Sequence, residues 1–386
     1  MMRDLFNYRF VLERNRSAWI DYARGICIIL VCYRHSFEGL INANFPTEHY
    51  PILSTLNSAL VTFRMALFFI ISGSFVSRTL EKKRYSTYVS DRFKVVLYPL
   101  LIWGAVQITL QLVFKNFTNA QREWVDYFYL ILMPRKIEQF WFLNTLFMVG
   151  IVYAFLKSVL RFRIWHLMLT ALIFYMLGGL FYSTNANMKY EILAYSFIPD
   201  LLHYFIFFFI GDAVTGYLHN LDTRQNFIKP IKLAGVFIFF VISHAYYTLV
   251  NAHFNKGYFV EFYMPASFIF IALGGCAFII QIAILLEKYR ILPFLRVLGY
   301  HSLYIYLLHI IFTGATRVLV KQVLHSDSVP LVLTLSILNG VLIPVIIYTV
   351  LTRNGFWWMF TLTKPNDEIN FYKSQPAIFT MKPVKT

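Results

Sequence analysis

The sequence predicts an all-α bundle of about ten transmembrane helices, and three observations support this fold class. Hydrophobic residues make up 58% of the 386-residue chain, only 14% are charged, and the mean hydropathy is +0.58. A soluble domain usually carries about a quarter charged residues. Ten apolar stretches are each long enough to cross about 30 Å of hydrocarbon. They are 19–41, 52–76, 95–114, 139–156, 164–182, 197–218, 231–250, 262–286, 297–320 and 330–352.

The third observation is the distribution of basic residues, which also predicts the orientation. Segment 1–18, the connections after even-numbered stretches and the tail 353–386 carry 23 Lys and Arg, whereas the opposite connections carry 7. Such a bias places the basic side, with both termini, in the cytoplasm. We therefore expect one membrane domain, 19–352, between two cytoplasmic segments. The net charge of +16 reflects this topology, so no nucleic-acid partner is expected.

The cysteines and the N-terminus predict neither a disulfide framework, nor a metal site, nor a removable signal peptide. Cys27, Cys32 and Cys276 all lie in apolar stretches, without the spacing of a disulfide framework or a zinc site. We expect them to pack in the core, and we expect no metal. The N-terminus shows no short apolar stretch followed by a cleavage site, so no removable signal peptide is expected. The basic segment 81–94 is expected to contact lipid headgroups.

The first apolar stretch carries ionisable residues, which are costly in a membrane and therefore indicate function. Arg24 and His35 are eleven residues apart, so on a helix they face the same way about 16 Å apart. Asp21 precedes Arg24 by three and Glu38 follows His35 by three, so both join that face. Arg34 lies on another face, with Glu38 as a possible partner. The simpler alternative is a set of structural ion pairs that hold this helix in the bundle.

The run IDYARGICIILVCYRH (20–35) resembles the opening of the integral-membrane acyltransferase 3 family. That family carries a basic residue and a histidine separated by ten residues in its first membrane helix, as Arg24 and His35 are here. Four more landmarks follow in the family's order: FRMALFFIISGSF (63–75), DRFKVVLYP (91–99), FWFLNTLF (140–147) and LGYHSLYIYLLH (298–309). One departure is Val95, where the family often has a second arginine after Arg92.

The resemblance implies an enzyme of the bacterial inner membrane. It would move an acyl group, most often acetyl, from cytoplasmic acyl-CoA to a hydroxyl of an envelope carbohydrate or a lipid-linked saccharide such as lipopolysaccharide. This chemistry needs a base for the hydroxyl proton, stabilisation of an oxyanion and a site for the CoA phosphates. Direct transfer and an acyl-histidine intermediate are both compatible with the sequence.

The catalytic candidates are His35, Arg24 and Glu38. His35 is the expected base, because a neutral imidazole accepts a proton near pH 7. Glu38 would orient the ring or stabilise the imidazolium. Arg24 would guide the thioester arm near the cytoplasmic face, held by Asp21 in a structural ion pair.

Candidates for binding the acyl-CoA lie in two segments. Arg92 and Lys94, at the cytoplasmic entrance, are expected to contact phosphates, although ordinary positive-inside charge explains them equally well. In the second apolar stretch, Arg64, Ser72 and Gly73 are the candidates. Arg64 is either a cation of the catalytic channel or the partner of an acidic group.

Candidates for binding the acceptor are Trp141, Asp200, His203, Ser302, Tyr306 and His309. The last three stack on one helix face, where interhelical hydrogen bonding is the alternative role. Asp200 and His203 would bind sugar hydroxyls, or simply begin a helix at the interface. Trp141 would stack on a sugar or acyl group, or belong to an interfacial belt.

Two other classes of protein compete with the enzyme. A secondary transporter would use the intramembrane ion pairs to relay protons, but such folds usually show inverted repeats and broken helices in matching positions. Gly274–Gly275 and Pro344 have no counterparts in the first half of the chain. A structural protein of an envelope assembly would not need five ionisable residues in its first helix. The enzyme is therefore favoured.

Overall fold

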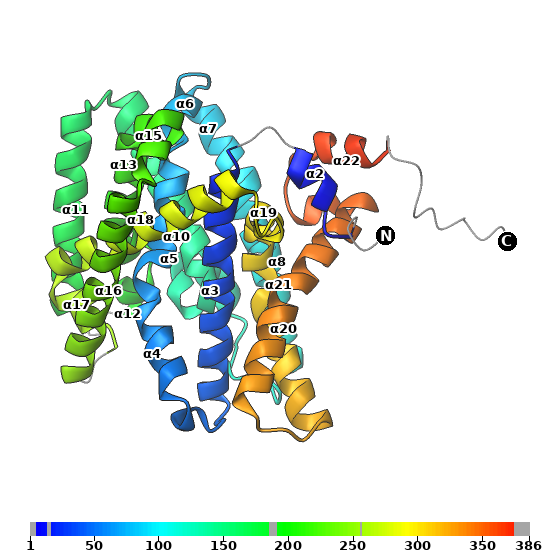
Figure 1. Ribbon diagram of the computed structural model, residues 1–386. Helices are drawn as coiled ribbons and strands as arrows, with labels where there is room; N and C mark the ends of the chain where they lie inside the picture. The colour runs from blue at the N-terminus through cyan, green and yellow to red at the C-terminus, as the bar shows by residue number, and fades with distance from the viewer. Residues whose placement is uncertain (1–4, 14–16, 185–190, 255–256, 374–386) are drawn as a thin grey trace.

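The computed structural model describes residues 5–13, 17–184, 191–254 and 257–373, which are largely helical and contain no strand. The long helices run side by side as one bundle (Figure 1). Nine helical segments of the described residues are long and apolar enough to cross a membrane. They are Pro51–Leu80, Tyr85–Val113, Glu138–Val159, Ile164–Tyr182, Leu193–Ala213, Pro230–His253, Pro265–Tyr289, Ser302–Val323 and Val329–Arg353.

A tenth long helix, α3 (Ala18–Asn42), contains the ionisable residues of the first apolar stretch. At 25 residues it is about 37 Å long, enough to cross the hydrocarbon layer. Each of the ten predicted stretches thus falls on a long helical segment. The all-α, polytopic fold class is confirmed, while the side on which the termini lie stays a prediction.

Several spans are built from consecutive helices. The second contains α4 (Pro51–Ala59), α5 (Val61–Gly73) and α6 (Val76–Leu80), and the third contains α7 (Tyr85–Arg92), a π-helical turn (Phe93–Leu97) and α8 (Tyr98–Val113). The later spans contain α10 (Trp141–Ala154) with a π-helical turn (Phe155–Val159), α11 (Ile164–Thr184), α13 (Ile198–Ala213), α16 (Pro230–His253), α18 (Pro265–Tyr289), α20 (Ser302–Val323) and α21 (Val329–Arg353).

Short helices connect or flank the spans. They are α2 (Tyr8–Glu13), α9 (Asp126–Leu132), α12 (Glu191–Tyr195), α14 (Thr215–His219), α15 (Leu221–Phe227), α17 (Phe259–Tyr263), α19 (Phe294–Tyr300) and α22 (Asn366–Lys373), with 3-10 turns at Thr47–His49, Pro134–Lys136, Glu138–Phe140 and Phe356–Met359. The predicted stretch 297–320 was wrong at its start, because α19 is a separate helix that lies against α3 and ends before α20 begins.

Helix α3 lies at the centre of the bundle, in contact with α5, α18, α19, α20 and α21 (Figure 1). Glycines permit its close approach to α19. A Cβ on Gly299 would lie 1.7 Å from the backbone oxygen of Asp21, and one on Gly25 would lie 2.1 Å from that of Leu295. These distances are far below van der Waals contact, so only glycine fits at either position. The crossing fixes the helix that carries His35.

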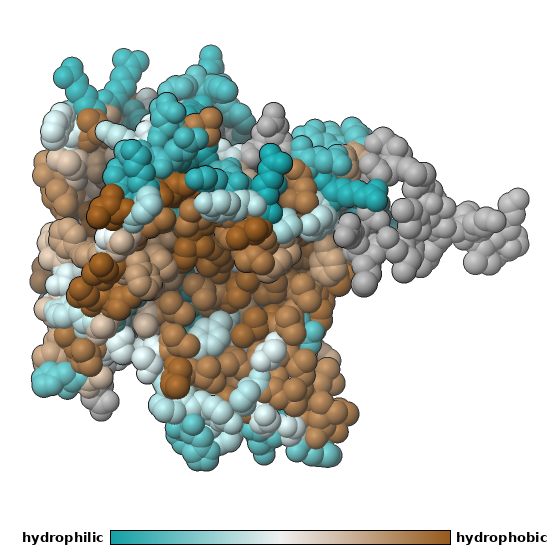
Figure 2. Space-filling view, in the orientation of Figure 1, coloured by the Kyte–Doolittle hydropathy of each residue, from teal (hydrophilic) through white to brown (hydrophobic). Residues whose placement is uncertain are grey.

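The surface agrees with a membrane environment. A broad apolar band crosses the middle of the molecule between two polar ends (Figure 2). Leu180, Ile242 and Leu249, which lie in candidate membrane spans, are among the large exposed apolar side chains. A soluble monomer rarely exposes so much contiguous apolar surface. The predicted burial of Cys27, Cys32 and Cys276 is confirmed, and all three are free thiols.

Candidate active site

A cavity of about 780 Å³ lies among α3, α5, α8, α17 and α20. Its α3 wall runs from Val31 to Asn42 and its α20 wall from Tyr306 to Gln322. The structure brings together five of the predicted site residues in its lining. These are His35, Glu38, Arg64, Trp141 and Tyr306. In the described part of the chain, no group of three metal-ligating side chains is present.

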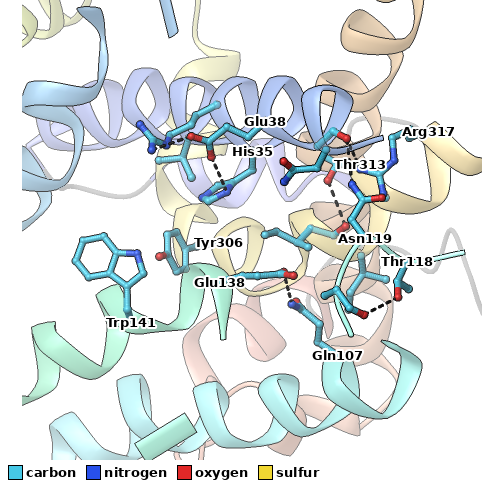
Figure 3. A pocket seen from close by; sticks show the side chains of 18 of the residues that line it. His35, Glu38, Gln107, Thr118, Asn119, Glu138, Trp141, Tyr306, Thr313 and Arg317 are labelled. Atoms are coloured by element: carbon cyan, nitrogen blue, oxygen red, sulfur yellow. Dashed lines mark hydrogen bonds and ion pairs between the residues drawn. The ribbon is translucent and has the colours of Figure 1, made fainter. Parts of the chain in front are cut away.

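His35 and Glu38 face each other one turn apart on α3 (Figure 3). His35 Nδ1 lies 3.9 Å from Glu38 Oε2, which is too long for a hydrogen bond but close enough for an ion pair with a protonated ring. The other oxygen, Oε1, lies 2.7 Å from Arg34 Nη2, so the predicted Arg34–Glu38 pair is confirmed. Arg34 also donates to the hydroxyl of Tyr258. Glu38 is therefore placed to stabilise an imidazolium rather than to orient a neutral ring.

Arg64 contributes a buried cation to the same cavity. Its side chain is 2% exposed, and its Nη1 donates to the Leu30 carbonyl at 2.8 Å. Its Nε has no hydrogen-bond partner, and no carboxylate of the described residues pairs with it. Of the two roles considered for Arg64, the unpaired channel cation fits this geometry. A guanidinium with unused donors can stabilise negative charge that develops in a reaction.

Helix α20 places two of its three candidate residues near His35. The rings of His35 and His309 have centroids 5.2 Å apart. His309 Nδ1 donates to the carbonyls of Tyr306 at 2.8 Å and Ile305 at 3.1 Å, which leaves its buried Nε2 without a partner. Tyr306 donates its hydroxyl to the Gln139 carbonyl. Ser302 lies outside the cavity lining.

Asp200 holds a cavity arginine rather than facing the cavity itself. Arg135 Nε donates to Asp200 Oδ2 at 2.8 Å, Arg135 Nη2 binds Oδ1, and Tyr182 donates to Oδ1 at 3.1 Å. Burial opposes the charge on Arg135, but Asp200 holds the pKa of Arg135 above its ordinary range. The guanidinium lies 4.2 Å over the ring of Trp141. Neither Asp200 nor His203 lines the cavity, so their contact with a sugar stays a prediction.

A family model described as an acyltransferase domain matches residues 17–352. The chain belongs to the acyltransferase 3 family. Two curated relatives are similar to this chain. Nodulation protein NolL of Sinorhizobium fredii (strain NBRC 101917 / NGR234) is 32% identical over 130 residues, which are 33% of each chain. NolL of Mesorhizobium japonicum (strain LMG 29417 / CECT 9101 / MAFF 303099) is 29% identical over 155 residues, which are 39% of each chain. The chain thus spans between a third and two fifths of the length of these relatives. No solved structure matches significantly.

The family assignment confirms the predicted resemblance. The matched model is described as an acyltransferase domain, which favours the predicted enzyme over the secondary transporter. Arg24 and His35 do lie on one uninterrupted helix, as their spacing predicts. The cavity wall begins only at Val31, however, so Arg24 lies outside the lining that contains His35. The pairing of Arg24 with Asp21 stays a prediction.

The residues proposed to bind the acyl donor also lie outside this cavity, apart from Arg64. Arg92 donates its Nε to the hydroxyl of Tyr88 at 3.1 Å. Lys94 lies on the π-helical turn Phe93–Leu97, and Ser72 near the end of α5. Their roles in binding the donor stay predictions.

Gly73 is needed for helix packing. A Cβ there would lie 2.0 Å from the Phe208 carbonyl oxygen, and one on Gly211 would lie 2.0 Å from that of Ile70. The two glycines allow α5 and α13 to cross closely. The Ser-Gly landmark is therefore a helix-packing feature, whatever else it does.

Several cavity residues were not found from the sequence. Glu138 accepts hydrogen bonds from Gln107 at 2.9 Å, Gln111 at 3.1 Å and Arg122 at 3.1 Å. This network fixes the long connection between the third and fourth spans against the cavity. The polar pair Gln107 and Gln111, four residues apart in an apolar stretch, was the available signal.

Glu261 is a second carboxyl group that was missed. It lies on α17, lines the cavity, and has its Oε1 3.9 Å from His203 Nε2. Burial raises the pKa of Glu261 to about 7, against the opposing charges of Arg135 and Arg34. The sequence held no signal for it, because α17 is a short helix outside the spans.

Proposed function

We propose that the protein is an O-acyltransferase of the bacterial inner membrane. It transfers an acyl group, acetyl first among the candidates, from acyl-CoA to a hydroxyl of a carbohydrate. The observation that carries the proposal is the cavity in which His35, the Glu38–Arg34 pair and the unpaired Arg64 converge. Base, counter-charge and oxyanion stabiliser are the groups that acyl transfer from a thioester requires.

His35 acts as the general base. With Nδ1 toward Glu38, the second ring nitrogen accepts the proton of the acceptor hydroxyl as its oxygen attacks the thioester carbonyl carbon. The new C–O bond forms, the C–S bond breaks, and the imidazolium returns its proton to the CoA thiolate. Glu38 stabilises the imidazolium across 3.9 Å while it exists.

Arg64 stabilises the oxyanion of the tetrahedral intermediate. Its charge is already desolvated and fixed through the Leu30 carbonyl, so little reorganisation is needed when negative charge develops. Loss of such a donor typically slows catalysis by about 100-fold or more.

The lining of the cavity supports a carbohydrate acceptor. Trp141, Tyr204 and Tyr258 supply aromatic surfaces, and the carboxyl group of Glu261 supplies a hydrogen-bond acceptor. Ligand sites combine apolar or aromatic walls with a few placed polar groups. Sugars match such a lining, because their hydroxyls donate to carboxylates and their apolar faces stack on aromatic rings.

The test is acyl-group analysis of envelope carbohydrate from cells that express wild type, His35→Ala and Arg64→Gln at matched membrane levels. His49, an exposed histidine of the connection after α3, provides a matched control as His49→Ala. We expect ester in the wild type and in the control, and none above background in the other two. Unchanged acylation in His35→Ala would overturn the assignment of the base.

A further inference from the structure

The cavity is elongated, and its two ends differ in chemistry. Its α20 wall runs over seventeen residues from Tyr306 to Gln322, and the rise between these two residues is about 24 Å. His35 and Tyr306 lie at the reacting end. The opposite end, here called the mouth, is formed by Phe114, Phe117, Arg317, Leu319 and Gln322. Figure 3 shows Arg317 and Asn119 at the end of the cavity away from Trp141.

Arg317 is the charged group of the mouth. Its Nη1 donates to the Gly39 carbonyl at 3.1 Å, and no carboxylate of the described residues pairs with it. The nearby carboxylate, Glu138, is already bound by Arg122, Gln107 and Gln111. A guanidinium has five N–H donors, so most of those of Arg317 are unused.

The close contact with α3 positions this guanidinium. A Cβ on Gly39 would lie 2.6 Å from Arg317 Nη1, so a glycine is needed there for the side chain to lie as it does. Lys321, one turn further along α20, does not line the cavity: its Nζ donates to the Ala43 carbonyl at 3.3 Å and lies 4.8 Å from the centre of the Phe45 ring. The unused donors of Arg317 match a phosphate group, which arginine binds through several parallel hydrogen bonds.

Three residues of the mouth are apolar and exposed. Phe114 is 50% exposed, Phe117 48% and Leu319 60%, although all three line the cavity. In a protein surrounded by lipid, such side chains contact hydrocarbon. The mouth therefore presents an anion-binding group beside a hydrocarbon surface, at the end that the charge bias predicts to be the outer side.

We propose that the mouth binds the phosphate and the adjoining hydrocarbon of a lipid-linked saccharide, whose sugar end extends along the cavity to His35. The inference rests on the proposed function, because it assigns the acceptor of that reaction. A free sugar carries neither a phosphate for Arg317 nor a hydrocarbon chain for the exposed apolar rim. A lipid phosphate uses both, and the 24 Å wall gives the attached sugars room to reach the base.

The experiment is a binding titration of the purified full chain in an uncharged detergent, followed by tryptophan fluorescence. The probes are a prenyl monophosphate, the corresponding prenol, inorganic phosphate and a phosphatidylglycerol. The variants are Arg317→Gln, Arg317→Lys and Gly39→Ala, with Arg163→Gln as the matched control. Arg163 is exposed just before α11, at the opposite end of the bundle by the alternation of the spans.

We expect the prenyl phosphate to bind more tightly than the other three probes. Arg317→Gln should weaken it by about 10-fold or more, as expected for loss of a charged hydrogen bond. Arg317→Lys should weaken it less, Gly39→Ala should also weaken it while the charge is kept, and Arg163→Gln should have no effect. Size-exclusion profiles identify any variant that fails to fold. If Arg317→Gln does not fold, the affinities of Arg317→Lys and Gly39→Ala test the proposal instead.

Three results would overturn the proposal: equal binding of prenol and prenyl phosphate, equal binding of inorganic phosphate or phosphatidylglycerol, or unchanged affinity in Arg317→Gln. His35→Ala should bind the prenyl phosphate normally, because His35 lies at the other end of the cavity. Normal binding without any acyl transfer by the wild type would contradict the proposed function alone. Acyl transfer that depends on His35 but not on Arg317 would contradict only the role assigned to the mouth.

Discussion

Glu38→Gln is expected to slow acyl transfer by removing the counter-charge of His35 without removing volume. The carboxylate lies 3.9 Å from His35 Nδ1. At that separation, the attraction to an imidazolium is worth about 4 kcal/mol at an effective dielectric constant of 20, and about 1 kcal/mol in water. The cavity lies between these limits, so the rate constant should fall between about 5-fold and 1,000-fold.

Arg34 moves the expected effect toward the larger value. Its Nη2 lies 2.7 Å from the other oxygen of Glu38, so Glu38→Gln leaves an uncompensated positive charge beside the imidazolium. Arg34→Gln combined with Glu38→Gln removes both charges and should therefore be less impaired than Glu38→Gln alone. This non-additivity is the signature of the proposed pair.

The assay measures acyl transfer in membranes that contain matched amounts of each variant, over a range of donor concentrations. We expect kcat to fall and KM for the donor to change little, because the interaction strengthens only as the proton is transferred. Glu48→Gln, in the exposed connection after α3, is the matched control. Glu38→Gln with more than half of the wild-type kcat would refute the reasoning.

Three further changes test the packing and the electrostatics. Gly299→Ala places a Cβ 1.7 Å from the Asp21 carbonyl oxygen, so α19 must move away from α3. We expect the free energy of unfolding to fall by about 3 kcal/mol or more, measured by thermal unfolding in detergent. Asp200→Asn breaks the pair with Arg135 and should cost about 2 kcal/mol, less than a fully buried pair, because the Arg135 side chain is 33% exposed. The pKa of Glu261 is raised in the folded state, so its contribution to stability is greatest below pH 4.5 and is lost as the pH rises through about 7. Between pH 5 and pH 8, the melting temperature should therefore fall more steeply in wild type than in Glu261→Gln.

Each of these has a control or a contrary result. Gly235→Ala, where nothing lies within 4 Å of the new Cβ, should leave the unfolding temperature unchanged. Asp222→Asn removes an exposed carboxylate of α15 and should have a negligible effect. Parallel pH profiles for wild type and Glu261→Gln would show that Glu261 does not titrate in this range.

Much of the reacting end of the cavity followed from spacing along one helix. His35 and Glu38 lie on one face of α3, and Arg34 pairs with Glu38, because helical periodicity alone relates residues three and four apart. The same argument placed Arg24 on the helix of His35, but spacing could not tell where the cavity ends. That limit depends on how α5 and α20 cover α3.

The acceptor candidates show where reasoning from local pattern was insufficient. Asp200 and His203 are three residues apart on α13, yet Arg135 and Tyr182 occupy the Asp200 carboxylate and the pair lies behind the cavity wall. Arg135 itself lies between the third and fourth spans, in a short 3-10 turn. Contacts between such segments are not encoded in the periodicity of either one.

Local sequence was sufficient for the membrane class, the number of long helices and the helical face of His35, because hydropathy and periodicity act over neighbouring residues. The cavity, and the roles of Glu138, Glu261 and Arg317 in it, depended on contacts between elements far apart in the chain. Those contacts arise from close helix crossings, such as Gly299 against Asp21, and from buried charges that must find partners across the bundle.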